Sequence, residues 1–200
     1  MSVPASTLIV SRQNYSWFSR VTRNGWLGFA GFLCLATAFA QAAEGKISKE
    51  YQLKAAFLYN FTKFVEWPRA RFPNETSPVV IGVLGRNPFD AELANVVNGR
   101  TLNGHPIVVR LVATAEEVRQ VHLLFVPAGE ESRLPANAWQ NSSIVSVGES
   151  DAFADLGGTI TFMQQDDKLR FAINVATAER DGLKLSAQLL KLAASVRRQL

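Results

Sequence analysis

One uninterrupted apolar segment of strand length and a second that is apolar except for one histidine place the strongest constraint on how this 200-residue chain can fold. They are Val79–Leu84 (VVIGVL) and Val121–Val126 (VHLLFV). A strand without polar alternation is typical of a parallel sheet that is covered on both faces. These segments therefore predict a sheet with helices packed on both sides.

The segments around these two strands predict an alternation of strands and helices. Further strands are expected at Ile107–Val112 and Ser143–Val147, and helices at 88–97, 114–120 and 150–156. Pro88 suits a first helical position, and Thr114 with Glu117 matches a capping box. Residues 130–140 predict one helical turn or two. This alternation favours a mostly parallel sheet.

Both ends of the domain depart from this alternation. Polar and apolar residues alternate in Thr159–Met163 and Leu169–Val175, which predicts an antiparallel hairpin with one face on the core. Leucine spacing predicts a closing helix at Leu183–Leu200. The first helix is expected at Tyr51–Trp67, capped by Ser48 and ended by Pro68. Its expected buried stripe consists of Leu53, Phe57, Phe61, Phe64 and Val65.

Together these elements predict the fold class. We expect an α/β layered sandwich with a mostly parallel central sheet of about six strands. An antiparallel hairpin lies near the C-terminus, and helices cover both faces of the sheet.

Residues 1–42 predict a signal peptide. Arg12, Arg20 and Arg23 precede a 14-residue apolar segment, Trp26–Phe39, and residues 1–42 contain no acidic residue. Small residues then fit cleavage after Ala40 or Ala42. The segment is short for a bilayer of about 30 Å, although an uncleaved membrane anchor is the alternative. We therefore expect residues 43–200 to form one exported α/β domain.

Removal of this segment changes the charge and the thiol content of the protein. The whole chain carries a net charge of +4, but 3 of its 21 basic residues and none of its 17 acids precede residue 43. The remaining domain is nearly neutral and lacks the excess of basic residues that is typical of proteins that bind nucleic acid. Cys34, the single cysteine, lies within the predicted signal peptide, so disulfides and thiol chemistry are excluded from the mature domain.

No motif in the mature sequence predicts catalysis, a metal or a cofactor. His105 and His122 are the only histidines, and they show no metal-ligand spacing. No G-x-S-x-G turn presents a nucleophile. The acidic pairs are adjacent in sequence and fall on predicted caps and turns, where solvated charges are expected. We predict that the protein is not an enzyme.

Two groups of residues are candidates for binding. Gly85, Arg86 and Asn87 follow a strand and precede a helix, where an anion could bind. The favoured alternative is that Gly82 and Gly85 only allow a tight turn from strand to helix, since no complete phosphate-binding motif is present. Aromatic residues are dense in and after the first helix, where they form either core or an exposed apolar patch. The candidates for a partner surface are Tyr59, Lys63, Trp67 and Phe72.

Two sequence blocks resemble the YfiR family of periplasmic proteins. The first is Lys54–Pro68 (KAAFLYNFTKFVEWP). The second is Phe171–Val175 (FAINV), continued by Gly182–Ser186 and Leu189–Ala193. Asn87–Phe89 occurs between them in the expected order, and the likeness covers residues 48–195.

The resemblance implies a compact α/β domain, often dimeric, with a regulatory role. It implies binding to the periplasmic part of an inner-membrane diguanylate cyclase, and a link to an outer-membrane OmpA-like lipoprotein. Restraint of the cyclase lowers cyclic-di-GMP and biofilm formation. The best-known member carries disulfides, whereas the mature chain here has no cysteine. The alternative is a receptor for a small periplasmic ligand that serves another membrane sensor or a transport system.

Overall fold

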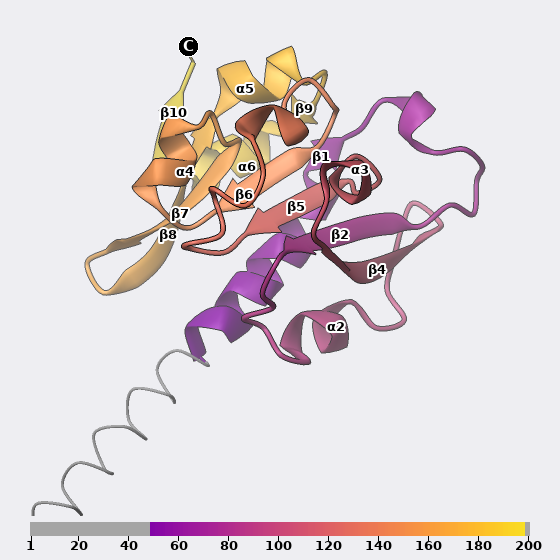
Figure 1. The fold of residues 1–200 in the computed structure, drawn as a ribbon, viewed down its shortest axis with the longest axis horizontal. Helices are drawn as coiled ribbons and strands as arrows, with labels where there is room; N and C mark the ends of the chain where they lie inside the picture. The colour runs from indigo at the N-terminus through magenta and orange to yellow at the C-terminus, as the bar shows by residue number, and fades with distance from the viewer. Residues whose placement is uncertain (1–48, 199–200) are drawn as a thin grey trace, which may run out of the picture. The chain divides into compact units, whose positions relative to one another are not determined.

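The computed structural model of the chain describes residues 49–198 (Figure 1). The predicted signal peptide, its cleavage sites after Ala40 or Ala42, Cys34 and the predicted cap Ser48 lie outside the described residues.

A single eight-stranded sheet forms the centre of the described domain, in the order β10-β8-β7-β6-β5-β2-β4-β3. The five neighbours from β4 to β7 pair in parallel, β7 and β8 form an antiparallel hairpin, and β10 pairs in parallel with β8. The predicted fold class is confirmed. The strands are β2 Val79–Leu84, β3 Thr101–Leu102, β4 His105–Val112, β5 Leu123–Val126, β6 Val145–Gly148, β7 Ile160–Gln165, β8 Lys168–Asn174 and β10 Ser195–Arg197.

The uninterrupted apolar strands are buried because both faces of the sheet are covered. Along β2, Val79, Ile81 and Val83 contact a larger core, whereas Val80 and Leu84 contact a smaller core on the opposite face. Successive side chains of a strand point to opposite faces, so both sets must be apolar.

Helices cover each face (Figure 1). The larger core is covered by the N-terminal helix, residues 49–63, with α2 Glu92–Val97, α5 Val175–Arg180 and α6 Ala187–Leu192. The smaller core is covered by α3 Ala115–Val118, the 3-10 turn η2 Ala136–Ala138 and α4 Asp151–Asp155. The predicted capping box of Thr114 and Glu117 is confirmed at α3.

The N-terminal helix ends at residue 63, so the predicted extension to Trp67 is wrong. Val65–Glu66 instead form strand β1, which pairs antiparallel with β9, Lys184–Leu185. Pro68 disfavours helical geometry at the residue before it. The β1–β9 pairing is extended by one hydrogen bond, which Ser186 N donates to Phe64 O at 2.9 Å.

The buried stripe of this helix differs from the predicted one. Leu53 is 47% exposed, whereas Leu58 and Phe61 are almost fully buried. Lys54 is also buried, since its ammonium group is paired with carboxylates. The other predicted members agree with the structure, since Phe61 and Val65 are buried and Phe57 and Phe64 pack against the larger core.

Two other helix predictions are wrong. The closing helix at Leu183–Leu200 is replaced by β9, α6 and β10, because Ser186 caps a new helix and Val196 pairs with Ile173 of β8. Residues 199–200 lie outside the described residues. Pro88 does not begin a helix: α2 begins at Glu92, since Asp90 has a positive φ of 49° that interrupts helical geometry.

Truncation of buried and exposed helix residues tests the observed stripe. We expect Phe61→Ala to lower the free energy of unfolding by about 3–5 kcal/mol, because it leaves a cavity among the rings of Phe57, Phe162 and Phe171. Leu53→Ala, on the exposed side, should cost less than about 1 kcal/mol. Urea unfolding followed by circular dichroism measures both, and equal costs would contradict the stripe.

Candidate functional site

A groove of about 470 Å³ opens between the β1–β9 pair and the β3–β4 hairpin. Of the predicted partner residues, Trp67 and Phe72 line it, and Tyr59 and Lys63 do not. We call it the aromatic groove; its other lining residues are Val65, Glu66, Arg69, Leu102, Asn103, His105 and Lys184.

Phe72 and His105 form the floor of the aromatic groove, and the buried ring of His122 supports Phe72 from behind. Phe72 lies between His105 and His122, with centroid distances of 4.4 Å and 4.8 Å. His105 Nδ1 also lies 2.7 Å from Ser77 O, which fixes the outer ring. Because both faces of Phe72 are covered, the floor is formed before any partner arrives.

Trp67 is more deeply buried than the sequence predicts, at 9% exposure. Its Nε1 donates a hydrogen bond of 3.1 Å to His122 O, and its ring meets the His122 ring edge-on at 87°. Trp67 therefore joins the end of the N-terminal segment to the start of β5.

His122, the buried ring of this stack, is held in its neutral form. Burial, followed by the positive charge of Arg71, lowers the pKa of His122 from 6.5 to about 4. Val80 N donates to His122 Nδ1 at 3.1 Å, so the ring proton of the neutral form is on Nε2. Arg71 itself donates to Arg119 O at 3.0 Å and to Val121 O, which ties the loop before β2 to the residues before β5.

Tyr59 lies between two cations instead of lining the groove. Lys63 Nζ is 4.1 Å and Arg100 Cζ is 4.5 Å from the centre of its ring. Hydrogen bonding by Arg100 is the largest cause that lowers the pKa of the Tyr59 phenol, and Lys63 adds to it. The aromatic pattern indicated Tyr59, but the contribution of Arg100 could not be read from local sequence.

The predicted ligand residues Gly85, Arg86 and Asn87 follow β2 in a tight turn. Gly85 has a φ of +64°, and a Cβ at this position would lie 2.2 Å from Glu130 Oε2. The carboxylate of Glu130, paired with Arg133, therefore lies over the turn. Asn87 accepts from Phe89 N at 3.0 Å and donates to Asp90 O at 2.9 Å within its own turn.

A buried polar network lies at the same carboxyl edge of the sheet, and no motif predicted it. Lys54 Nζ is 2.6 Å from Glu50 and is also paired with Glu149, which follows β6. Glu149 Oε1 accepts from Tyr51 OH at 3.0 Å and from Ala128 N at 2.8 Å. Burial, and then Glu149, raise the pKa of Tyr51. The spacing of Glu50 and Lys54 was the only local signal.

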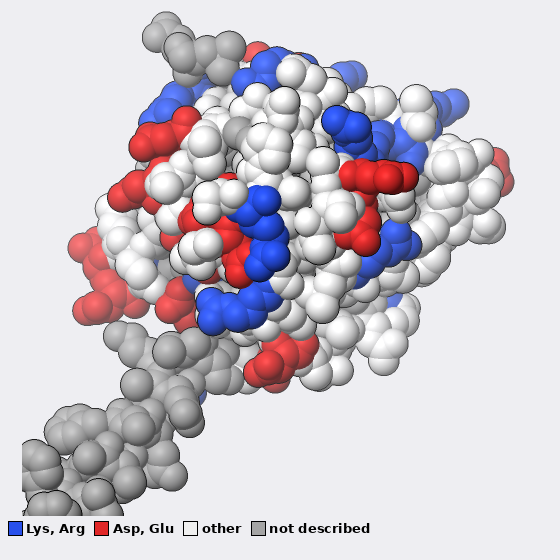
Figure 2. Space-filling model, viewed as in Figure 1, with Lys and Arg blue, Asp and Glu red and all other residues white. Residues whose placement is uncertain are grey.

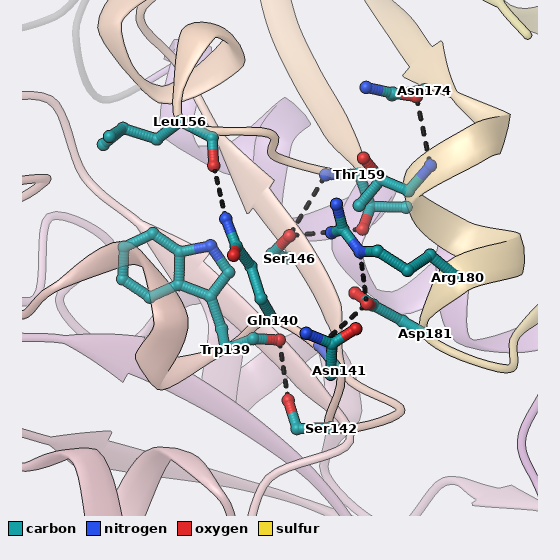
Figure 3. Close-up of polar contacts among 11 residues, drawn as sticks. Trp139, Gln140, Asn141, Ser142, Ser146, Leu156, Thr159, Asn174, Arg180 and Asp181 are labelled. Atoms are coloured by element: carbon teal, nitrogen blue, oxygen red, sulfur yellow. Dashed lines mark hydrogen bonds and ion pairs between the residues drawn. The ribbon is translucent and has the colours of Figure 1, made fainter. Parts of the chain in front are cut away.

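A second network orders the segment that leads to β9 (Figure 3). The buried Asp181 Oδ1 accepts from Asn141 N at 2.8 Å and from Arg180 Nε at 3.2 Å. Asn174 caps α5 by accepting from Thr177 N at 3.1 Å. These contacts fix α5 and the turn after it, which positions Lys184 in the wall of the groove.

The face drawn in Figure 2 carries both acidic and basic side chains, and several of the acidic ones lie together on its left side. Among residues 49–198, no group of three or more His, Cys, Asp or Glu side chains could hold a metal ion. No helix in this part of the chain is both long enough and apolar enough to cross a membrane.

Replacement of Lys54 tests the buried network. We expect Lys54→Met to lower the free energy of unfolding by about 3–5 kcal/mol, because Glu149 is left buried without its cation. Lys63→Met, which removes an exposed cation from the same helix, should cost less than about 1 kcal/mol. Thermal and urea unfolding measure the difference. Similar values for the two variants would contradict the network.

Titration of His122 tests the ring stack. In the unfolded chain its imidazole binds a proton below about pH 6.5, whereas the folded protein resists protonation to about pH 4. The contribution of His122 to the free energy of unfolding is therefore complete above pH 6.5. As the pH drops from 6.5 toward 4, the unfolded chain binds a proton that the folded protein does not, and the free energy of unfolding falls by up to about 3 kcal/mol. NMR of the histidine Cε1–H signals measures the pKa, with His122→Gln for assignment. A His122 midpoint near 6.5 would contradict this environment.

Comparison with known proteins identifies the family but gives little structural precedent. A crystal structure of a conserved domain protein from Vibrio cholerae is similar, with 11% identity and a TM-score of 0.42; the match covers 64% of this chain. The chain spans 57% of the length of that protein. No curated protein matches the sequence. The model of the YfiR/HmsC-like family matches residues 51–194, and the chain belongs to this family.

Proposed function

We propose that this protein is a periplasmic regulatory binding protein that restrains an inner-membrane diguanylate cyclase and so lowers cyclic-di-GMP and biofilm formation. Membership in the YfiR/HmsC-like family supports a periplasmic regulator of the cyclic-di-GMP pathway. The observation that carries the binding mode is the aromatic groove, whose floor of stacked rings is already formed. A preformed floor lowers the entropy cost of association.

Such a regulator acts through a difference in affinity. It must bind the inactive state of the cyclase more tightly than the active state, since equal affinity for both would shift nothing. An outer-membrane OmpA-like lipoprotein would then release the cyclase by competing for the regulator. A homodimer would present two grooves to the cyclase.

The protein in this proposal is exported and acts by binding instead of by catalysis. Residues 1–42 direct export and are removed after Ala40 or Ala42, and residues 43–200 form the active regulator. The regulatory character of the family supports a role without catalysis.

The geometry favours a macromolecular partner over the alternative of a small-ligand receptor. In that alternative, a ligand binds Gly85, Arg86 and Asn87. The carboxylate of Glu130 lies over Gly85, so an anion would first have to displace the Glu130–Arg133 pair. The aromatic groove requires no such displacement.

Deletion and complementation test the proposal in cells. We expect deletion of the gene to raise cyclic-di-GMP and surface attachment, and the wild-type chain to restore both. Lys63→Glu should restore them only in part, because it reverses an exposed charge beside Tyr59. Lys168→Glu, on the exposed end of the β7–β8 hairpin, is the matched control.

Two measurements complete this test. Cyclic-di-GMP is quantified by mass spectrometry, and affinity capture from the cell envelope identifies the membrane partner. Unchanged cyclic-di-GMP after deletion would refute regulation of a cyclase.

A further inference from the structure

We propose that the aromatic groove binds an extended acidic segment of the partner, which carries one large apolar side chain between its carboxylates. This inference rests on the proposed function, because it describes the part of the membrane partner that the regulator grips. Charge, strand edges and the shape of the floor each support it.

The charge around the groove favours an acidic occupant. Two cations, Arg69 and Lys184, line it against a single acid, Glu66. Lys63 and Arg100, the two cations beside Tyr59, lie two residues before the lining residues Val65 and Leu102. Within residues 49–198, none of these four cations forms an ion pair with a carboxylate. Their charge is therefore available to a partner, and it would repel a basic segment.

Two strand edges border the groove and favour an extended occupant. β3, which contributes Leu102, is the last strand at its end of the eight-stranded sheet. β1, which contributes Val65 and Glu66, pairs only with β9 among the described strands. An edge strand presents unpaired backbone groups to which an incoming strand can add. Because both edges are only two residues long, side-chain contacts must supply most of the specificity.

The floor of the groove favours one large apolar side chain. Trp67, Phe72, Leu102 and Val65 are the apolar residues that line its volume of about 470 Å³. This volume is within the range of about 300–1,000 Å³ that is common for ligand pockets. Burial of an aromatic or leucine side chain against this floor supplies the apolar contribution, and the surrounding cations select its acidic neighbours.

Peptide binding to the mature protein tests this inference. The probes are a fluorescein-labelled decapeptide of alternating Glu and Val with a central Trp, and the same peptide with every Glu replaced by Lys. We expect the acidic peptide to bind at least tenfold more tightly in fluorescence anisotropy at low salt. Replacement of its Trp by Gly should weaken binding by about tenfold.

Charge-reversal variants locate the binding surface. The double variant Arg69→Glu/Lys184→Glu should weaken the acidic peptide at least tenfold and favour the basic one. The matched control, Lys168→Glu/Arg170→Glu, reverses two exposed cations on the β7–β8 hairpin and should change neither affinity. All four residues are exposed, so circular dichroism should be unchanged in both double variants.

Each contrary result overturns the inference. Equal affinity for the two peptides, an equal effect of the two double variants, or complete displacement by inorganic phosphate would show that the groove does not select an acidic strand. Cyclic-di-GMP in the deletion strain separates the two claims. If it is unchanged while the peptide results hold, regulation of a cyclase fails and the acidic-segment site remains.

Discussion

The antiparallel pairing of β1 with β9 is the contact on which the functional face depends. It joins Val65 to Leu185 and Glu66 to Lys184, residues that are more than 100 positions apart in the chain. Each of the two sequence blocks that resemble the YfiR family contains one strand of this pairing, and Phe61 of the first block packs against Phe171 of the second at 5.1 Å. One wall of the aromatic groove is therefore built from two distant parts of the chain, with Val65 and Glu66 from β1 and Lys184 from β9.

The N-terminal helix holds the two edges of the sheet at a set distance. Its 15 described residues span about 22 Å. Near its start, Lys54 binds Glu149, which follows β6 at the carboxyl edge of the sheet. Beyond its end, Trp67 binds His122 O, which precedes β5 at the amino edge. The segment from Lys54 to Trp67 therefore connects a polar contact at the carboxyl edge of the sheet with another at the amino edge.

The sequence predicted six of the eight strands of the central sheet, but not the short strands β3 and β10 at its ends, nor the site. Strand β2, Val79–Leu84, could be predicted because its unbroken apolar sequence is typical of a strand buried on both faces. The cap at Thr114 could be predicted because its hydrogen-bond partner, Glu117, lies only three residues away in the sequence. The stack of His105, Phe72 and His122 joins three distant segments, so no spacing could reveal it. The closing helix was wrong for the same reason, since pairing of Val196 with β8 overrides helical leucine spacing.

The distribution of polar groups between the two sheet edges bears on the class of partner. In α/β proteins with a parallel sheet, small ligands usually bind at the carboxyl ends of the strands. Here that edge is filled by the protein's own groups, with Glu130 over Gly85 and Glu149 bound to Lys54 and Tyr51. The accessible groove lies instead at the amino edge, beside His105 and the short strands β1 and β3. An open groove bordered by strand edges, with an aromatic floor, suits a polypeptide better than a small metabolite. An extended peptide can pair with the strand edges along its length, whereas a small ligand usually needs a pocket that buries most of its surface.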